Sequence, residues 1–203
     1  MMKIIKISEK TILENALLVK QGEIIVFPTD TVYGLVCDPF IEKAVQKIYE
    51  AKKRDKKHLP ILVSNIKRLT EICKVTPYVK KLAETFWPGQ LTMILPSKVK
   101  LPKFFDSKSI AVRIPKNIDT VNLIEKCGGY LVGTSANISG LKPPRTVFDA
   151  YKQLRNLPIV YLDGGITDGI PSTIIMIKNK KIKILREGAI SSKELFDVLG
   201  ETQ

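Results

Sequence analysis

The segment EIIVFPTDTVYGL, residues 23–35, decides the fold class that we expect for this chain. Its first half, EIIVFP, is a short apolar run that predicts a buried strand. Its second half carries the hydroxyls of Thr29, Thr31 and Tyr33 directly after that strand. Ligands commonly bind at the carboxyl ends of strands in open α/β sheets, so the segment indicates an α/β fold with a site there. The alternative is an ordinary turn in which Asp30 caps backbone amides.

Helices and strands alternate on both sides of this segment. Apolar periodicity and capping residues predict helices from Ser8 to about Lys20, from Ile41 to Lys53, from Ser64 or Asn65 to Cys73, after Thr76-Pro77, from Asp119 to Lys126, from about Thr146 to Arg155, and after Ser191. Further strands are predicted at LPILVS (59–64), LTMILP (91–96), SIAVRIP (109–115), YLVGTS (130–135) and IVYLDGG (159–165), with a hairpin at STIIMIK (172–178) and KIKILRE (181–187). We therefore expect one α/β domain over residues 1–203, with a twisted mixed β-sheet flanked by helices.

The composition is that of an ordinary globular protein with a basic surface. The chain has 203 residues, 44% of them hydrophobic and 26% charged, which suits one domain with a real core. Its 33 basic and 20 acidic residues give a formal charge of +13. That charge favours polyanionic partners such as nucleotides or RNA. The alternative is a lysine-rich surface that only interacts with solvent, because the lysines are spread along the whole chain.

Several common sites are excluded by the sequence. It has no G-x-G-x-x-G fingerprint, and GGYLVGTS (128–135) lacks the lysine of a phosphate-binding loop. His58 is the only histidine, and Cys37, Cys73 and Cys127 form no C-x-x-C pair, so no metal site or disulfide framework is indicated. The first ten residues contain no apolar stretch of signal-peptide length, and no aliphatic run could span a bilayer. We expect a soluble cytoplasmic protein with no membrane partner.

Three further loops resemble the first in their chemistry. They are KKRDKKH (52–58), GTSANISG (133–140), and PST (171–173) with REG (186–188). Short hydroxyls and exposed amides bind carboxylates and phosphates, and nearby cations balance the charge. Arg113 stands in an otherwise apolar strand and needs a partner or a ligand unless it faces solvent at an edge. Together these features predict a site for an anionic, phosphorylated small molecule that acts by positioning and charge stabilisation.

The ordered motifs PTDTVYGL, K-x-R, WPG-x-LT, SIAVR-P, TSAN-SG, PST and REG, over about residues 22–190, resemble the YrdC family of threonylcarbamoyl-adenylate synthases. The resemblance implies one twisted α/β domain with a basic central cavity. It also implies an enzyme, a nucleotidyltransferase that makes threonylcarbamoyl-AMP and pyrophosphate from L-threonine, bicarbonate or carbon dioxide, and ATP. The product would feed the formation of N6-threonylcarbamoyladenosine in tRNA through downstream threonylcarbamoyl-transfer proteins.

The resemblance also implies roles for individual residues. The threonine pocket would be lined by Thr31, Val63, Arg113, Gly133 and Ser172, with Arg113 on the carboxylate and Val63 on the methyl group. ATP, as a substrate, would be held by Lys52, Arg54, His58, Ser109, Ser135, Pro143 and Arg186, with Lys52 and Arg54 as the catalytic residues. No residue is implied as a metal ligand, and Mg²⁺ would be carried by the phosphates.

One segment departs from the family pattern and leaves alternatives open. After Arg54 the chain continues Asp55-Lys56-Lys57-His58-Leu59-Pro60, an order closer to the YciO branch, although Arg54 and the TSAN loop are retained. The chain also ends soon after REG, so we expect a short, single-domain form. The main alternative is a non-catalytic RNA-binding module. A relative that uses carbamoyl phosphate is less favoured by the chain length. Direct contact with tRNA or RNA is left open.

Overall fold

The structure is a computed structural model that describes residues 4–53, 59–106, 108–178 and 181–200. Within these residues ten strands form one sheet: β1 (Ile4–Lys6), β2 (Ile25–Phe27), β3 (Gly34–Cys37), β4 (Ile61–Val63), β5 (Leu91–Pro96), β6 (Ser109–Arg113), β7 (Tyr130–Ser135), β8 (Val160–Asp163), β9 (Thr173–Lys178) and β10 (Lys181–Arg186). The helices are α1 (Glu9–Lys20), α2 (Glu42–Lys52), α3 (Ile66–Ile72), α4 (Pro77–Phe86), α5 (Ile118–Lys126), α6 (Val147–Leu154) and α7 (Ser192–Leu199).

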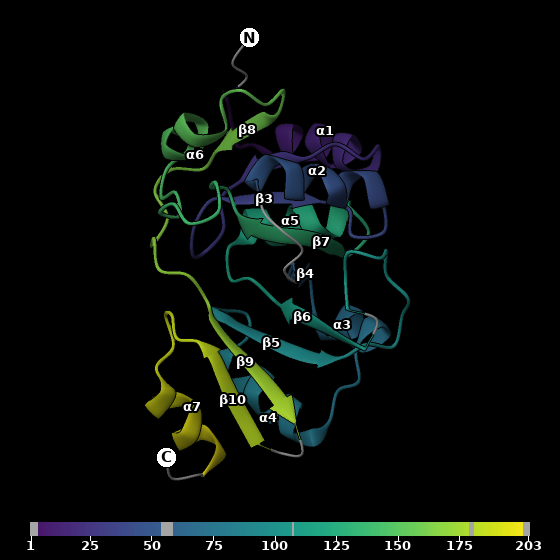
Figure 1. Ribbon diagram of the computed structural model, residues 1–203, viewed down its shortest axis with the longest axis vertical. Coiled ribbons are helices and arrows are strands. Elements are labelled where there is room, and N and C mark those ends of the chain that lie inside the picture. The colour runs from purple at the N-terminus through teal and green to yellow at the C-terminus, as the bar shows by residue number, and fades with distance from the viewer. Residues whose placement is uncertain (1–3, 54–58, 107, 179–180, 201–203) are drawn as a thin grey trace.

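The sheet is mixed, in the order β1-β8-β2-β3-β7-β4-β6-β5-β9-β10. Four of its pairs are parallel, β1 with β8, β2 with β8, β4 with β6, and β5 with β9. The other pairs are antiparallel. Figure 1 shows the resulting twist, with β3 and β7 running across the upper half and β9 and β10 steeply inclined at the lower end. The predicted α/β class and mixed sheet are confirmed.

The helices begin where polar side chains can satisfy their free amide groups. Asn65, Thr76 and Asn117 accept hydrogen bonds at the starts of α3, α4 and α5. Ser8, Thr146 and Ser191 each form a capping box with the residue three positions later. The helix starts predicted at Ser8, Asn65, Thr76, Thr146 and Ser191 are therefore confirmed to within a residue.

The two faces of the sheet are covered differently. One face, called here the closed face, packs against apolar residues of α2, α3, α4, α6 and α7. The other, the open face, packs against α1 and α5. These two helices contact β3, β4 and β7. No described residue of β5, β6 or β9 belongs to the buried apolar cluster in which α1 and α5 pack against the open face. This part of the sheet is where a cavity forms.

Two strands were not predicted from the sequence. β1 is only three residues long, so alternation could not identify it. β3 begins at Gly34, inside the segment that we had expected to be a loop, and pairs antiparallel with β2. A β-carbon at Gly34 would lie 3.3 Å from the carbonyl oxygen of Thr134, so glycine allows the close approach of β3 to β7.

The capping box of α6 gives a test of the fold. The hydroxyl of Thr146 accepts from the amide of Asp149 at 3.1 Å and donates to its carboxylate at 2.8 Å. Thr146→Ala should therefore lower the free energy of unfolding by about 1 kcal/mol in chemical denaturation. Thr85→Ala is the matched control, because Thr85 is exposed near the end of α4 and its change should stay within about 0.5 kcal/mol. Equal losses in both variants would contradict the capping role.

Candidate ligand-binding site

A row of side chains on the open face forms the floor of the cavity. The row crosses five neighbouring strands, β4, β6, β5, β9 and β10. Leu62 lies opposite Arg113 in the parallel pair of β4 and β6. Thr92 lies opposite Ile174, and Ile174 lies opposite Arg186. Paired residues in a sheet share a face, so these five side chains meet although they are far apart in the sequence.

Arg186 reaches this row because of a bulge in β10. The register shifts between Ile184 and Arg186, so that Ile184 pairs with Ile175 while Arg186 pairs with Ile174. Without the extra residue, Leu185 would take the place opposite Ile174. The bulge therefore directs a cation instead of a leucine to the cavity, and Leu185 is left 45% exposed.

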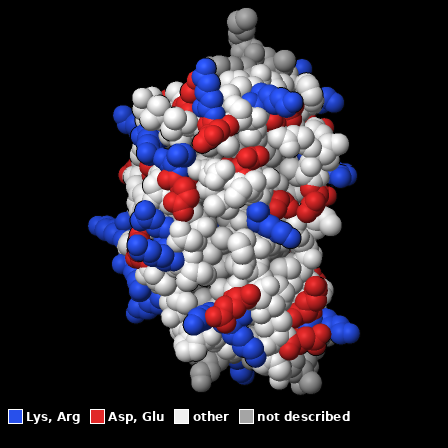
Figure 2. Space-filling view, turned by 180° about the vertical axis from the view of Figure 1, so that it is seen from behind, with Lys and Arg blue, Asp and Glu red and all other residues white. Residues whose placement is uncertain are grey.

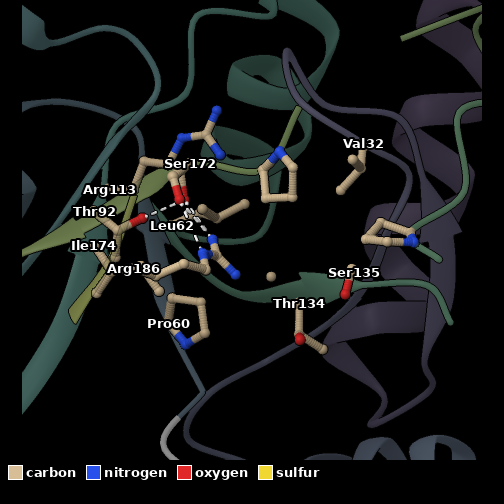
Figure 3. A pocket seen from close by; sticks show the side chains of 13 residues that line it. Val32, Pro60, Leu62, Thr92, Arg113, Thr134, Ser135, Ser172, Ile174 and Arg186 are labelled. Atoms are coloured by element: carbon tan, nitrogen blue, oxygen red, sulfur yellow. Dashed lines mark hydrogen bonds between the residues drawn. The ribbon is translucent and has the colours of Figure 1, made fainter. Parts of the chain in front are cut away.

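Loops at the ends of β2, β7 and β8 close the cavity over this floor (Figure 3). Its volume is about 170 Å³, and the lining is completed by Val32, Pro60, Gly133, Thr134, Ser135, Pro143, Pro171 and Ser172. A β-carbon at Gly133 would lie 2.5 Å from Cδ1 of Leu62, so glycine at this position leaves space for Leu62. The described cavity is smaller than the roughly 300 Å³ of a typical drug-sized site, and it suits a small polar metabolite.

The cavity combines two arginines with hydroxyls. Its described lining includes Arg113 and Arg186 and contains no carboxylate. The Arg186 guanidinium donates to the carbonyl oxygen of Ser172 at 2.6 and 3.1 Å and to its hydroxyl at 3.3 Å. That hydroxyl in turn pairs with the hydroxyl of Thr92 at 2.9 Å. Cations and neutral hydroxyls without acids are the donor set of an anion-binding site.

Arg113 is the buried cation of the site. It is 5% exposed, and its Nε donates to the carbonyl oxygen of Gly89 at 2.8 Å. Nη1 donates to the hydroxyl of Thr31 at 3.1 Å, and Nη2 lies 2.7 Å from a carboxylate oxygen of Asp30. Burial lowers the pKa of Arg113, and the charge of Asp30 opposes that effect. The adjacent carboxylate of Asp30 thus favours the charged form of the guanidinium.

Lys52 holds the loop that follows β7. The side chain is 2% exposed, and its ammonium group donates to the carbonyl oxygens of Ser135 and Asn137. Its own carbonyl oxygen accepts from the amide of Ser139 at 3.0 Å. Lys52 is not among the described residues that line the cavity. Its contacts therefore shape the loop that carries Ser135, and its expected contact with a phosphate stays a prediction.

The structure brings most of the expected site residues together. Arg113, Gly133, Ser135, Pro143, Ser172 and Arg186 line the cavity. Thr31 lies beside it through its hydrogen bond to Arg113. Arg54 and His58 lie outside the described residues. Which ligand each residue holds stays a prediction.

Val63 and Ser109 are not placed at the cavity. The side chain of Val63 is fully buried in the core of the closed face, because successive residues of a strand point to opposite faces. The expectation that it contacts a ligand methyl group is therefore corrected, and Leu62 is the residue of β4 that faces the cavity. Ser109 lies at the opposite end of β6 from Arg113 and donates to the carboxylate of Asp106 at 2.9 Å.

The hydroxyls of the segment 28–35 mainly hold that segment in place. Thr29 donates to the carbonyl oxygen of Val32 at 2.8 Å and pairs with the hydroxyl of Thr31. The hydroxyl of Tyr33 donates to the carbonyl oxygen of Gly165 at 2.7 Å, and burial raises the pKa of Tyr33 to about 12. Neither Thr29 nor Tyr33 is among the described lining residues. The strand end is correctly located, but these two hydroxyls do not face the cavity.

Sequence reasoning did not identify several lining residues. Thr92 carried a usable signal, since it is a polar residue that alternates with apolar Leu91 and Met93 in a buried strand. Leu62, Ile174 and Val32 carried none, because apolar residues on the floor of a cavity have the same pattern as core residues.

The structure offers no metal centre and no membrane span in the part that it describes. No group of three or more histidine, cysteine or acidic residues in the described ranges could hold a metal ion. No helix in those ranges is long and apolar enough to cross a membrane. The three cysteines are free and buried.

The fold and cavity define an α/β protein with a small cavity, lined in part by two arginines, on the open face of a mixed sheet. The family model Sua5_yciO_yrdC, described as "Telomere recombination", matches residues 17–188. Since this range covers most of the chain, the protein belongs to the Sua5/YciO/YrdC family. The resemblance found in the sequence motifs is confirmed.

The chain is similar to proteins that are called threonylcarbamoyl-AMP synthase. It is 33% identical to the one from Pyrococcus abyssi over 201 residues, which is 97% of this chain but 59% of that protein. It is 36% identical to the one from Buchnera aphidicola over 167 residues, covering 79% of this chain and 87% of that protein. The crystal structure of P. abyssi Sua5 complexed with L-threonine superposes with a TM-score of 0.91 at 32% identity, over 98% of this chain and 60% of that chain.

The loop-holding contacts of Lys52 predict a loss of stability on substitution. Lys52→Met should lower the free energy of unfolding by about 2–3 kcal/mol, because the hydrogen bonds of a buried ammonium are lost. The melting temperature should fall by about 5–10 °C. Lys53→Met is the matched control, since Lys53 is exposed and its change should leave the melting temperature nearly unaltered. An unchanged melting temperature in Lys52→Met would contradict the loop-holding role.

Proposed function

We propose that this protein is an L-threonylcarbamoyladenylate synthase, which makes threonylcarbamoyl-AMP and pyrophosphate from L-threonine, bicarbonate or carbon dioxide, and ATP. The observation that carries the proposal is the row of Leu62, Arg113, Thr92, Ile174 and Arg186 across five strands. It sets two cations and a hydroxyl beside apolar side chains in a cavity of amino-acid size. The similarity to synthases of the same family supports the same activity.

The reaction needs a site that gathers several anions and does not need a strong base. The amine of threonine captures carbon dioxide and loses a proton, which gives a carbamate. A carbamate oxygen then attacks the α-phosphorus of ATP, and the bond to the leaving pyrophosphate breaks. Threonine contributes a carboxylate and the nucleotide contributes its phosphates, so fixed cations and hydroxyl donors stabilise the assembly.

In this proposal the two arginines have separate roles. The buried guanidinium of Arg113 binds the carboxylate of threonine. Ser172, which lines the same cavity, binds the hydroxyl group of threonine. Leu62 and Ile174 provide apolar contact for the methyl group. Arg186 is more exposed and binds a phosphate, together with hydroxyls of Thr134 and Ser135. The described part of the lining offers no carboxylate to a metal, so Mg²⁺ would stay on the phosphates and neutralise charge on the leaving pyrophosphate.

The wider setting belongs to the same proposal. The product would be passed, in the cytoplasm, to proteins that transfer the threonylcarbamoyl group to tRNA. Direct RNA binding is the competing function, and the charge of +13 is compatible with it. On the face shown in Figure 2, however, acidic side chains lie among the basic ones, and uncharged surface separates the charged groups. That face offers no continuous basic surface of the kind that follows a phosphate backbone.

Substrate choice tests the proposed activity directly. Pyrophosphate release should depend on threonine, and serine should be used less well by about 1 kcal/mol or somewhat more, because it lacks the methyl group that meets Leu62 and Ile174. Valine, which lacks the hydroxyl, should also be a poor substrate. The measurement is pyrophosphate release with each amino acid in turn. Equal turnover of all three amino acids would reject the pocket assignment. If pyrophosphate release does not depend on threonine and the protein binds RNA tightly in a salt-dependent way, the RNA-binding module is favoured instead.

Arg186 tests the phosphate side of the cavity. Arg186→Ala should reduce threonine-dependent pyrophosphate release by at least about tenfold, since charged hydrogen bonds contribute roughly 1.5–3 kcal/mol. Lys183→Ala is the matched control, because Lys183 is an exposed cation of the same strand and is not among the described lining residues. If Arg186→Ala stays active while its melting temperature collapses, Arg186 has a structural role and the phosphate assignment is wrong.

A further inference from the structure

Asp30 lies directly behind Arg113. Its side chain is 11% exposed, and Oδ1 lies 2.7 Å from Nη2 of Arg113. Both carboxylate oxygens and Nη2 are buried, and none of the three has a well-directed hydrogen bond among the described residues. The contact is therefore a close, buried ion pair. A buried charge of this kind depends on its partner, because removing one leaves the other uncompensated.

The remaining contacts of Arg113 fix its orientation. Nε is occupied by the carbonyl oxygen of Gly89, and one N–H of Nη1 by the hydroxyl of Thr31. The second N–H of Nη1 has no acceptor among the described residues. A carboxylate therefore cannot take the Nε edge as a bidentate pair without displacing Gly89, and Nη2 is buried beside Asp30. Nη1 is the nitrogen left for a ligand in this arrangement.

The loop that carries Asp30 is itself tied to two other loops. The side-chain amide of Gln90 donates to the carbonyl oxygen of Asp30 at 2.7 Å and to a carboxylate oxygen of Asp168 at 2.9 Å. The amide of Gly169 donates to the carbonyl oxygen of Thr31 at 2.7 Å. Two other chain segments thus hold the backbone of Asp30 and Thr31 in place, and a residue that orients another residue requires such support.

We propose that Asp30 is a positioning residue, which holds the Arg113 guanidinium so that Nη1 serves the amino-acid carboxylate. This inference rests on the proposed function for the identity of that carboxylate. Asp30 touches no ligand, because its oxygens are buried. It acts through Arg113 and thereby controls the amino-acid half of the site, while Arg186 binds Ser172.

Charge and orientation predict opposite results when Asp30 loses its charge. If Asp30 merely weakened the positive charge of Arg113, Asp30→Asn would strengthen the binding of any anion, and ATP would respond as well as threonine. If Asp30 orients the guanidinium, threonine affinity falls by about tenfold or more, as for the loss of a charged hydrogen bond. In that case ATP affinity changes by less than about twofold, because the phosphates use other groups.

The experiment measures the dissociation constants of L-threonine and ATP by calorimetry for the parent, Asp30→Asn and Asp197→Asn. Asp197→Asn is the matched control, since it removes an exposed charge on α7 and Asp197 is not among the described lining residues. It should leave both affinities unchanged. Tighter or unchanged threonine binding in Asp30→Asn would overturn the proposal, as would equal weakening of threonine and ATP.

A spectroscopic measurement separates this inference from the proposed function. The Nε–H signal of Arg113, identified by its absence in Arg113→Lys, should be protected from exchange in the parent by its bond to Gly89. It should shift or exchange faster in Asp30→Asn, and an unchanged signal would overturn the proposal. If Asp30→Asn does not fold, Asp30→Glu keeps the charge and moves the carboxylate, so the signal should shift and threonine affinity should fall. No change in either would overturn the proposal. If the parent shows no threonine-dependent turnover, the proposed function is rejected. The Nε–H signal of Arg113 then still tests whether Asp30 orients the guanidinium.

Discussion

The burial of one guanidinium constrains the arrangement of this site. Arg113 ends a strand in which it follows apolar Ile110, Ala111 and Val112, and only 5% of it is exposed. A charge in that position is tolerated only when neighbouring groups compensate it. Asp30, Thr31 and the carbonyl oxygen of Gly89 do so from two different loops. The loops between β2 and β3 and between α4 and β5 must therefore converge on the middle of the sheet, and this convergence builds one wall of the cavity.

The unequal covering of the sheet explains why the cavity lies where it does. Within the described ranges, five helices supply apolar residues to the closed face, and two, α1 and α5, supply them to the open face. Because these two helices contact β3, β4 and β7, the same face of β5, β6 and β9 is free to carry polar side chains. A polar row at this place does not cost core packing, since the closed face of the same strands holds Met93, Val112 and Ile175.

Local sequence patterns predicted the elements well but not their pairing. Capping residues and apolar periodicity located the helix starts because they act within one turn. β1 and β3 were missed because three or four residues carry too little pattern. Leu62 and Val63 could not be assigned to faces without the strand pairs, and the family pattern favoured Val63. The bulge before Arg186 has no glycine or proline to mark it, so only the register of β9 and β10 explains why Arg186 meets the cavity.

Under the proposed function, burial divides the two arginines of the cavity into two kinds of binding group, one for a carboxylate and one for a phosphate. All three nitrogens of the Arg113 guanidinium contact neighbouring protein groups. The side chain therefore loses little conformational entropy when a carboxylate binds it. Arg186 is exposed at the end of β10 and donates hydrogen bonds to Ser172. A phosphate chain varies in conformation and carries several charges, and an exposed guanidinium can adjust to it. A small amino acid offers one carboxylate in a fixed relation to its side chain, and recognising it requires the rigid partner. The sheet provides the rigid cation at its centre and the adaptable one at its edge.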